Sequence, residues 1–394
     1  MSRDLLFVVP RFGAGIVGGA ETLAAGLIAR AVDPRDRVSV ATTCAVDHTT
    51  WANSLPAGES VEGGVRILRF PVSDRDDARH GRLHGRLQRD GRLGYLEELE
   101  LMGAGVWSAG LQEHIERHGP GYDAMIFVPY LFGTTYWGVQ AHPERSLLLP
   151  CLHDEPDAHM RCLAGPFGAV AGWIFNTPAE ERLARRLYRV RAGGVVGAGL
   201  DPPEGPAPSG FAASHGLGRY LLYAGRLERG KRVDIAVEYA ARLITESAPD
   251  LRLVLIGSGS YQPPRHLRDR VLRVGYVDDT TKRAAYAEAL ALVNPSEMES
   301  LSLVLLEAWR EGTPALVAHG SEVMREHCER SGGGVAFRDY AGFASAVRSL
   351  LDDPVRAVAM GAAGRDYVAG EYGWDAVATR FRAVLDAVLS AGGR

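Results

Sequence analysis

The chain has 394 residues, more than one ordinary hydrophobic core accommodates, so its length predicts at least two domains. Hydrophobic residues make up 46% and charged residues 23% of it, which is typical of globular proteins and argues against a disordered or fibrous chain. The formal net charge of -4 provides no general attraction to nucleic acid, so we expect no nucleic-acid partner. Only two of the 44 basic residues are lysines, Lys231 and Lys282.

Three features bear on the compartment. No stretch of about 18 apolar residues could form a transmembrane helix. The N-terminus enters a short apolar run with no small-residue cleavage site after it, which favours a first strand over a signal peptide. The four cysteines form no C-x-x-C pair and fit free thiols in a reducing compartment: Cys44, Cys151, Cys162 and Cys328. We therefore expect a cytoplasmic protein.

Short apolar runs alternate with amphipathic stretches in the first half of the chain. The predicted strands are 5–9, 38–43, 65–70, 124–128, 147–152, 173–176 and 195–196. A helix is expected over residues 20–31. Such alternation, with solidly apolar strands, predicts a parallel sheet covered by helices on both faces.

A stretch with four prolines and four glycines, residues 201–218, interrupts this pattern and predicts an interdomain linker over 202–218. The alternation then restarts, with strands expected at 220–224, 251–256, 271–274, 290–293 and 315–318. The expected helices are 233–245, 281–289, 303–310, 341–351 and 375–389.

The predicted fold class is therefore α/β, with two doubly wound Rossmann-like domains facing a cleft. The expected domains are residues 1–201, joined by a C-terminal helix over 372–394, and residues 219–371. In this architecture a ligand binds at the carboxyl ends of the strands.

The sharpest chemical signal is a pair of glutamates. Glu299 lies in the loop after the strand at 290–293, and Glu307 lies about two turns inside the following helix. Carboxylates so placed can accept hydrogen bonds from two separate diols. The alternative is a solvated acidic turn, but Glu307 lies in an apolar run where a carboxylate needs a partner. Ser300 or Ser302 is expected to cap this helix.

Two further loops are candidates for phosphate binding. Arg226 and Lys231, after the first strand of the second half, can converge on one phosphate, unless they belong to a solvated basic loop. Glycines at 13, 15, 18 and 19 would let the backbone approach a ligand at a helix start, or form only a tight turn. A dinucleotide site would need an acidic residue near Thr43, which the sequence lacks. The turns at 257–259 and 275–277 could meet a phosphate or a base, or be plain turns.

Together these motifs resemble the nucleotide-sugar glycosyltransferases of the GT-B fold, in particular the retaining glycosyltransferase family 4. Glu299 and Glu307 match the E-x7-E motif of that family. Gly225-Arg226-Leu227 and Lys231 match its G-R-L…K loop, and Gly18-Gly19-Ala20-Glu21 match its N-terminal loop. The resemblance covers nearly the whole chain, and the motifs are specific jointly rather than singly.

The resemblance implies transfer of a sugar from a nucleotide-diphosphate sugar to an acceptor hydroxyl, with retention of configuration and without a metal ion. Arg226 and Lys231 would bind the donor diphosphate, and Glu307 the ribose. Glu299 would hold the donor sugar, and His153 would lie near the transferred sugar. The remaining donor-binding positions would be Gly18, Gly19, Gly257, Val277, Ser300, Leu301, Ser302 and Leu303.

Two departures from the family pattern concern the donor. Arg232 replaces the glycine that usually follows the loop lysine, and Leu301-Ser302 replaces a Phe-Gly pair. A serine close to the donor sugar leaves the identity of that sugar open. No cofactor is expected beyond the donor itself, which could be a UDP-, GDP- or dTDP-sugar. The acceptor could be a specialised metabolite, a lipid or a polysaccharide, and the oligomeric state stays open.

Other segments have weaker signals. Five arginines recur at helical spacing, but interspersed glycines weaken a helix, so we expect a mobile, solvated acceptor-side segment rather than a membrane contact: Arg75, Arg79, Arg82, Arg86 and Arg89. Histidines, acids and cysteines crowd between Cys151 and Cys162 without a common zinc spacing, so no metal site is expected. Lys282 is expected on an exposed helix, without a role.

Three alternatives to a transferase remain. A sugar-nucleotide epimerase could use the same two-domain architecture. An NAD-dependent oxidoreductase would need the missing acid near Thr43. A catalytically inactive sugar-binding module would not need the intact glutamates and basic residues.

Overall fold

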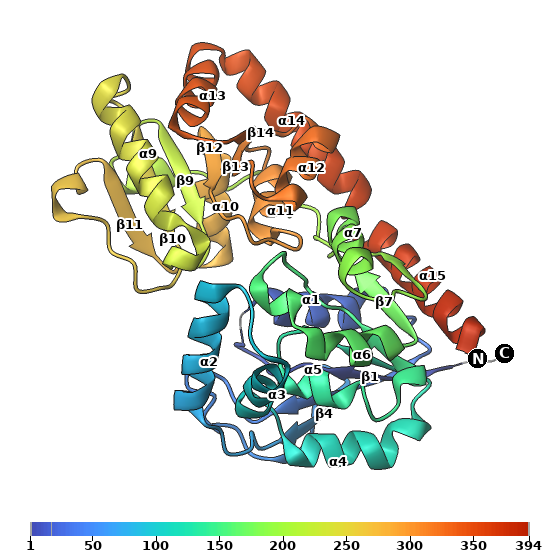
Figure 1. The fold of residues 1–394 in the computed structure, drawn as a ribbon. Coiled ribbons are helices and arrows are strands. Elements are labelled where there is room, and N and C mark those ends of the chain that lie inside the picture. The colour runs from blue at the N-terminus through green and yellow to red at the C-terminus, as the bar shows by residue number, and fades with distance from the viewer. Residues whose placement is uncertain (1, 17, 393–394) are drawn as a thin grey trace. The chain divides into compact units, whose positions relative to one another are not determined.

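The structure is a computed structural model that describes residues 2–16 and 18–392. The chain divides into two compact units, residues 1–199 with 374–394 and residues 200–373. In each unit, helices pack against a largely parallel sheet (Figure 1).

The sheet of the first unit has the strand order β3-β4-β2-β1-β5-β6-β7-β8. Its strands are β1 (Asp4–Val8), β2 (Arg37–Thr43), β3 (Gly58–Glu62), β4 (Val65–Phe70), β5 (Ala124–Phe127), β6 (Ser146–Leu148), β7 (Gly172–Phe175) and β8 (Gly193–Val195). Adjacent strands are parallel except β3 and β4. Strand β3 was not predicted, because it is an edge strand whose residues are mostly exposed and form no apolar run.

The helices of the first unit surround this sheet. They are α1 (Gly19–Gly26) with its π-helical continuation η1 (Leu27–Ala31), α2 (Asp77–Asp90), α3 (Tyr95–Ala104), α4 (Ala109–His118), α5 (Gly133–Gly138), α6 (Arg161–Ala169), α7 (Pro178–Leu187) and α15 (Trp374–Gly392). Three short 3-10 turns accompany them: η2 (Gly119–Gly121), η3 (Pro143–Arg145) and η4 (Pro156–His159).

Helix α2 covers most of the segment that was expected to be mobile and solvated, with a helix weakened by glycines. The side chain of Asp76 accepts a hydrogen bond from the Arg79 backbone N–H and so caps the helix. Leu83 and Leu87 are buried, and Arg86 forms an ion pair of 2.7 Å with Glu97 of α3. Burial of these leucines offsets the backbone entropy that the glycines cost.

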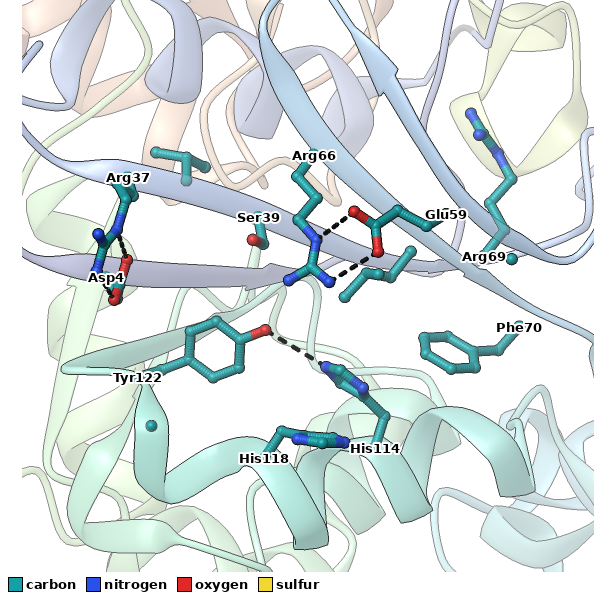
Figure 2. Close-up of a pocket in the computed structure, with 14 residues that line it drawn as sticks. Asp4, Arg37, Ser39, Glu59, Arg66, Arg69, Phe70, His114, His118 and Tyr122 are labelled. Carbon is teal, nitrogen blue, oxygen red and sulfur yellow. Dashed lines mark hydrogen bonds and ion pairs between the residues drawn. The ribbon is translucent and has the colours of Figure 1, made fainter.

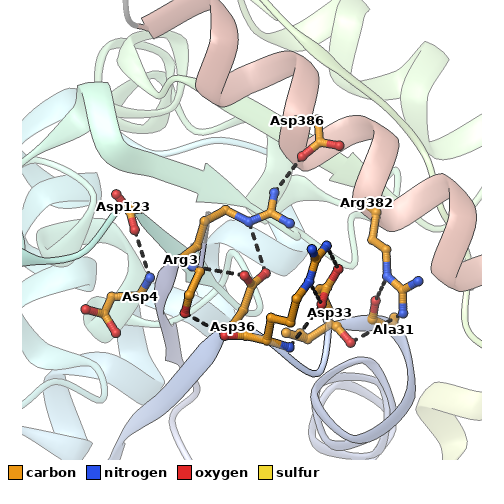
Figure 3. A network of polar contacts seen from close by, with 11 residues as sticks. Arg3, Asp4, Ala31, Asp33, Asp36, Asp123, Arg382 and Asp386 are labelled. Atoms are coloured by element: carbon orange, nitrogen blue, oxygen red, sulfur yellow. Dashed lines mark hydrogen bonds and ion pairs between the residues drawn. The ribbon is translucent and has the colours of Figure 1, made fainter.

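The last helix, α15, packs on the first unit (Figure 3). The Arg3 guanidinium lies 2.6 Å from Asp386 of α15 and 3.0 Å from Asp36, and Arg382 donates a hydrogen bond of 2.9 Å to the Ala31 carbonyl. A Cβ added to Gly199 would lie 2.2 Å from the Trp374 ring, so a glycine there allows the ring to pack closely.

The sheet of the second unit is entirely parallel, with the order β11-β10-β9-β12-β13-β14. Its strands are β9 (Tyr220–Ala224), β10 (Arg252–Ile256), β11 (Val271–Gly275), β12 (Ala291–Asn294), β13 (Ala315–Ala318) and β14 (Gly334–Phe337). Its helices are α8 (Phe211–Ser214), α9 (Val233–Glu246), α10 (Asp279–Ala287), α11 (Leu303–Arg310), α12 (Glu322–Ser331), α13 (Tyr340–Asp352) and α14 (Pro354–Glu371), with the 3-10 turns η5 (Arg229–Lys231) and η6 (Arg265–Leu267). The predicted fold class, two doubly wound Rossmann-like domains, is confirmed.

Three further expectations concern the linker, the cysteines and membrane-spanning helices. The predicted linker contains the short helix α8, and the Glu288 carboxylate accepts hydrogen bonds from the backbone N–H groups of Gly210 and Ala212. The four cysteines form no disulfide. Among the described residues, no helix is both long and apolar enough to cross a membrane.

Candidate active site

The predicted donor residues lie at the carboxyl ends of the strands of the second unit. The chain passes from β9 to β10 and β11 on one side, and then returns to β12 on the other side of β9. Strand order therefore reverses between β9 and β12, which is where ligands bind in sheets of this kind. The loop with Arg226 and Lys231 follows β9, and the loop with Glu299 follows β12.

The loop after β9 is supported by the loop after β10. Leu227 donates a backbone hydrogen bond of 2.8 Å to the Ser258 carbonyl, and the Tyr223 hydroxyl donates one of 2.8 Å to the Arg226 carbonyl. Gly257 has φ +129°, and a Cβ added there would lie 1.9 Å from the Gly225 oxygen. Gly257, predicted to touch the donor, thus has a clear function in packing the two loops together.

Lys231 and Glu299 are brought together across the strand-order reversal. The Lys231 Nζ atom lies 2.8 Å from Glu299 Oε1 and donates a hydrogen bond of 3.2 Å to the Met298 carbonyl. Only 24% of the lysine side chain and 12% of the glutamate side chain are exposed. By contrast, the Arg226 side chain is 57% exposed and its guanidinium lies 3.5 Å from Glu228. The loop after β9 therefore offers an anion two cations, the partly buried Lys231 and the solvated Arg226.

The start of α11 differs from the expected serine cap. Ser302 occupies the N-cap position, but its side chain makes no capping hydrogen bond. The Ser302 hydroxyl instead accepts a hydrogen bond of 3.0 Å from the buried Asn294 amide, and its backbone has φ +69°. This left-handed conformation favours glycine, the residue that the family pattern has at this position. Leu301 is buried beside it, whereas Ser300 and Leu303 are half-buried.

Glu307 has the partner that its apolar surroundings require. The Lys282 ammonium lies 2.8 Å from Oε1 of Glu307, and the buried Tyr286 hydroxyl donates a hydrogen bond of 3.1 Å to Oε2. Lys282 was expected on an exposed helix, but its side chain is only 28% exposed and pairs with Glu307. Burial lowers and the charge of Glu307 raises the pKa of Lys282, which lies above its usual value.

The loop after β11 completes this edge of the sheet. Gly257 donates a backbone hydrogen bond of 2.7 Å to the Gly275 carbonyl, which joins the loops after β10 and β11. Val277 is half-buried, and the Tyr276 side chain is 74% exposed. The position predicted to lie near the base therefore falls between β11 and α10, the helix that carries Lys282 and Tyr286.

In the first unit, the glycine-rich loop follows β1 and opens α1; Val17 lies outside the described residues. A Cβ added to Gly18 would lie 2.1 Å from Glu21 Oε2, whereas nothing lies within 4 Å of one added to Gly19. Glu21 forms an ion pair of 2.5 Å with Arg11, a buried residue that the sequence analysis did not single out. Gly18 thus makes room for Glu21, and Gly19 is the position open to a ligand.

His153 follows β6 and is held by residues that the sequence analysis missed. Its Nδ1 atom lies 3.3 Å from Glu155 Oε1, which also accepts a hydrogen bond of 2.7 Å from the Tyr130 hydroxyl. Burial raises the pKa of Glu155, but His153 and Tyr130 lower it to below its usual value. Leu152 donates its backbone N–H to the buried Glu180 at 2.5 Å. The contact with Glu155 therefore uses the Nδ1 atom of His153 and not its Nε2 atom.

The described residues contain no cluster of three or more metal-ligating side chains. The sequence contains one D-x-D triplet, whose two carboxylates are of the ligand type that Mg²⁺ binds, at Asp74-Arg75-Asp76. It lies in the first unit at the start of α2, and Asp76 serves as the helix cap. The triplet therefore has a structural function there.

A cavity of about 730 Å³ lies elsewhere in the first unit, between the sheet and α4 (Figure 2). Arg66 forms a bidentate ion pair of 2.7 Å with Glu59, and Arg37 pairs with Asp4. Burial lowers the pKa of His114 to about 4, and its ring lies 3.4 Å from the Tyr122 hydroxyl. Since its arginines already pair with carboxylates, this cavity is a poor candidate for a diphosphate.

Part of the second unit resembles a known protein family. Residues 218–353 match the family of glycosyl transferases group 1. The second unit carries a group 1 glycosyl transferase domain. The match lies over the loops that hold Arg226, Lys231, Glu299 and Glu307, and it confirms the resemblance to the nucleotide-sugar glycosyltransferases; family 4 in particular stays a prediction.

Two relatives show how much of the chain is similar to known proteins. The glycogen synthase of Mycobacterium tuberculosis is 38% identical over 170 residues, 40% of this chain and 40% of that protein. The match thus spans less than half the length of that relative. D-inositol 3-phosphate glycosyltransferase 2 of Catenulispora acidiphila is 29% identical over 313 residues, 69% of this chain and 73% of that protein.

Solved structures extend the similarity to the whole fold. The sucrose-phosphate synthase of Thermosynechococcus elongatus has a TM-score of 0.73 at 18% identity, covering 99% of this chain and 100% of that one. Anabaena HepE, solved with UDP and glucose, has a TM-score of 0.69 at 15% identity over 98% and 100%. The two units therefore have the GT-B type of fold.

Proposed function

We propose that the protein transfers a sugar from a nucleotide-diphosphate sugar to an acceptor hydroxyl, with retention of configuration and without a metal ion. The observation that carries the proposal is the pairing of Lys231 with Glu299 across the strand-order reversal, inside the group 1 domain. Retention is included because the resemblance to family 4 implies it.

The site supplies the electrostatics that such a reaction needs. A departing nucleoside diphosphate develops negative charge, and cations fixed near it stabilise the transition state. Lys231 is held within 3.2 Å of the loop that opens α11, and the exposed Arg226 follows the same strand as Lys231. A helix start adds backbone N–H groups and a positive dipole end. Together these groups could stabilise the leaving diphosphate without a metal ion.

The acceptor is proposed to bind on the first unit, near Gly19 and His153. The relative with the longer match is named a D-inositol 3-phosphate glycosyltransferase, and the relative with the shorter match is named a glycogen synthase. We therefore include D-inositol 3-phosphate and glycogen among the acceptors to test, beside lipid and small-metabolite alcohols.

The first experiment is a thermal-shift panel with UDP, GDP, ADP and dTDP. A nucleotide that binds only the folded protein stabilises it by about 2.7 kcal/mol at a hundredfold excess over its Kd. The proposal requires at least one nucleotide to raise the melting temperature. Absence of any shift across the panel would contradict it.

The second candidate, a sugar-nucleotide epimerase, differs in needing no acceptor. The two reactions are separated by incubating the protein, without acceptor, with a sugar conjugate of the nucleotide that binds. The products are then analysed. The transferase proposal predicts an unchanged sugar until an acceptor is added. A new epimeric nucleotide sugar in that reaction would favour the epimerase.

A further inference from the structure

Lys282 and Tyr286 form a two-donor clamp on the carboxylate of Glu307. Both residues lie on α10, four positions apart and hence on one helix face, while Glu307 lies on α11. The ammonium contacts Oε1 at 2.8 Å and the hydroxyl contacts Oε2 at 3.1 Å. Each oxygen of Glu307 therefore has its own donor, and the carboxylate is fixed in both position and plane.

The clamp leaves acceptor capacity on Glu307. A carboxylate offers about four lone-pair positions, two on each oxygen. The contacts with Lys282 and Tyr286 use one position on each oxygen, so one position remains on each. The two carboxylate oxygens thus present two neighbouring acceptors. This arrangement suits a vicinal diol, which offers two neighbouring hydroxyl donors. About 22% of the Glu307 side chain is exposed, so it can be reached.

Lysine at this position places a positive charge beside the carboxylate of Glu307. Asp279 lies 3.2 Å from the same ammonium but is 70% exposed, so Glu307 is the less solvated partner. An ionised carboxylate accepts stronger hydrogen bonds than a neutral acid and cannot itself donate. A fixed, charged, two-position acceptor should therefore bind a diol more tightly than a single hydroxyl.

From this geometry we propose that Lys282 is a positioning residue that orients Glu307 toward both ribose hydroxyls of the donor. The inference rests on the proposed function, because it assumes that a nucleotide binds at this edge of the sheet. It also narrows the donor class: the protein selects a ribonucleoside diphosphate sugar over a 2′-deoxy donor such as a dTDP-sugar, because only the former presents the complete diol.

The chain offers a matched control on the same helix. Arg283, the next residue of α10, forms an ion pair of 2.9 Å with Glu311 at the end of α11. Arg283→Met therefore removes an ion pair between the same two segments without touching Glu307. Lys282→Met removes the clamp, and Lys282→Arg restores charge with a different, forked geometry.

The experiment measures Kd by calorimetry for the pairs UDP and dUDP, GDP and dGDP, and ADP and dADP, with melting temperatures recorded for each variant. We expect the wild type to bind one ribonucleotide roughly 10- to 100-fold more tightly than its deoxy partner. Lys282→Met should reduce this ratio of the two Kd values at least threefold, and Arg283→Met should leave it unchanged. The ratio for Lys282→Arg should fall between those of the wild type and Lys282→Met.

The outcomes separate the two levels of the proposal. If no nucleotide of any pair binds the wild type, the proposed function fails together with this inference. If nucleotides bind but the wild type shows equal affinity for ribo and deoxy forms, only the inference is overturned. The inference is also overturned if Lys282→Met keeps the wild-type ratio of Kd values. It is overturned as well if Arg283→Met lowers that ratio as much as Lys282→Met does. If Lys282→Met does not fold, an unaltered ratio in Lys282→Arg and Lys282→Gln overturns it.

Discussion

The Lys231 ammonium lies 2.8 Å from Oε1 of Glu299, and so one of only two lysines in the chain pairs with the first glutamate of the E-x7-E motif. The second lysine, Lys282, pairs with the second glutamate, Glu307, at the same separation. In a chain that otherwise uses arginine, both lysines thus lie at the proposed donor site. A compact ammonium fits a single carboxylate oxygen, whereas a guanidinium is wider and forked.

Replacement of Lys231 tests the leaving-group part of the proposal. Lys231→Met removes the less exposed cation, so kcat/KM for transfer should fall roughly 100- to 1,000-fold. Lys231→Arg should recover part of this loss because it keeps the charge. Steady-state kinetics with the accepted donor measure both variants, and a change below threefold in Lys231→Met would show that the lysine does not act on the leaving group.

Ser302 gives a prediction about stability. Ser302→Ala keeps the unfavourable φ of +69° and removes the acceptor of the buried Asn294 amide, so it should cost about 1–3 kcal/mol. Ser302→Gly loses the same hydrogen bond but relieves about 1–2 kcal/mol of backbone strain. Urea unfolding should therefore rank the glycine variant above the alanine variant; the reverse order would contradict the strain.

Gly257 and Gly230 form a matched pair of glycines in neighbouring loops. Gly257→Ala places a Cβ 1.9 Å from a backbone oxygen at φ +129°, and it should destabilise the protein by at least about 2 kcal/mol. Gly230→Ala meets nothing within 4 Å and should be close to neutral. Melting temperatures compare the two, and equal effects would show that the loops do not depend on this contact.

His84 gives a pH-dependent contact between α2 and η4. A hydrogen bond that the His84 ring donates to the Asp157 carboxylate, at 3.3 Å, raises the pKa of His84 above its usual value near 6.5. Its stabilisation is thus complete below that value and is lost as the pH rises through the raised pKa. His84→Gln should lower the melting temperature more at pH 5.5 than at pH 8.5. An equal difference at both pH values would argue against the charged pair.

The sequence predicted the parts of the fold that depend on local patterns. Helix α11 and strand β13 have the predicted bounds, because apolar runs there end in strong turn residues. Strand β14 was missed, since three of its four residues are only half-buried and its run is short. The glycines of helix α2 led to the expectation of a weakened helix, because the sequence pattern does not show the burial of Leu83 and Leu87.

The site was predictable in its residue types but not in its contacts. The E-x7-E spacing identified Glu299 and Glu307, whereas the partner of Glu307 lies 25 residues earlier in the chain on another helix. The apolar run around Glu307 did indicate that a partner was needed. The sequence analysis missed Arg11, Glu155 and Glu180 because these residues lie outside the recognised motifs. Only the folded structure shows the residues that they contact.

The most direct measurement is the release of nucleoside diphosphate from a panel of UDP-, GDP-, ADP- and dTDP-sugars in the presence of mixed acceptors. The account predicts release from at least one ribonucleotide donor by the wild type. It predicts loss of that release in Lys231→Met and Glu307→Ala proteins whose melting temperatures show that they are folded. No release from any donor, or undiminished release by both variants, would contradict the assignment of a transferase site to this edge of the second unit.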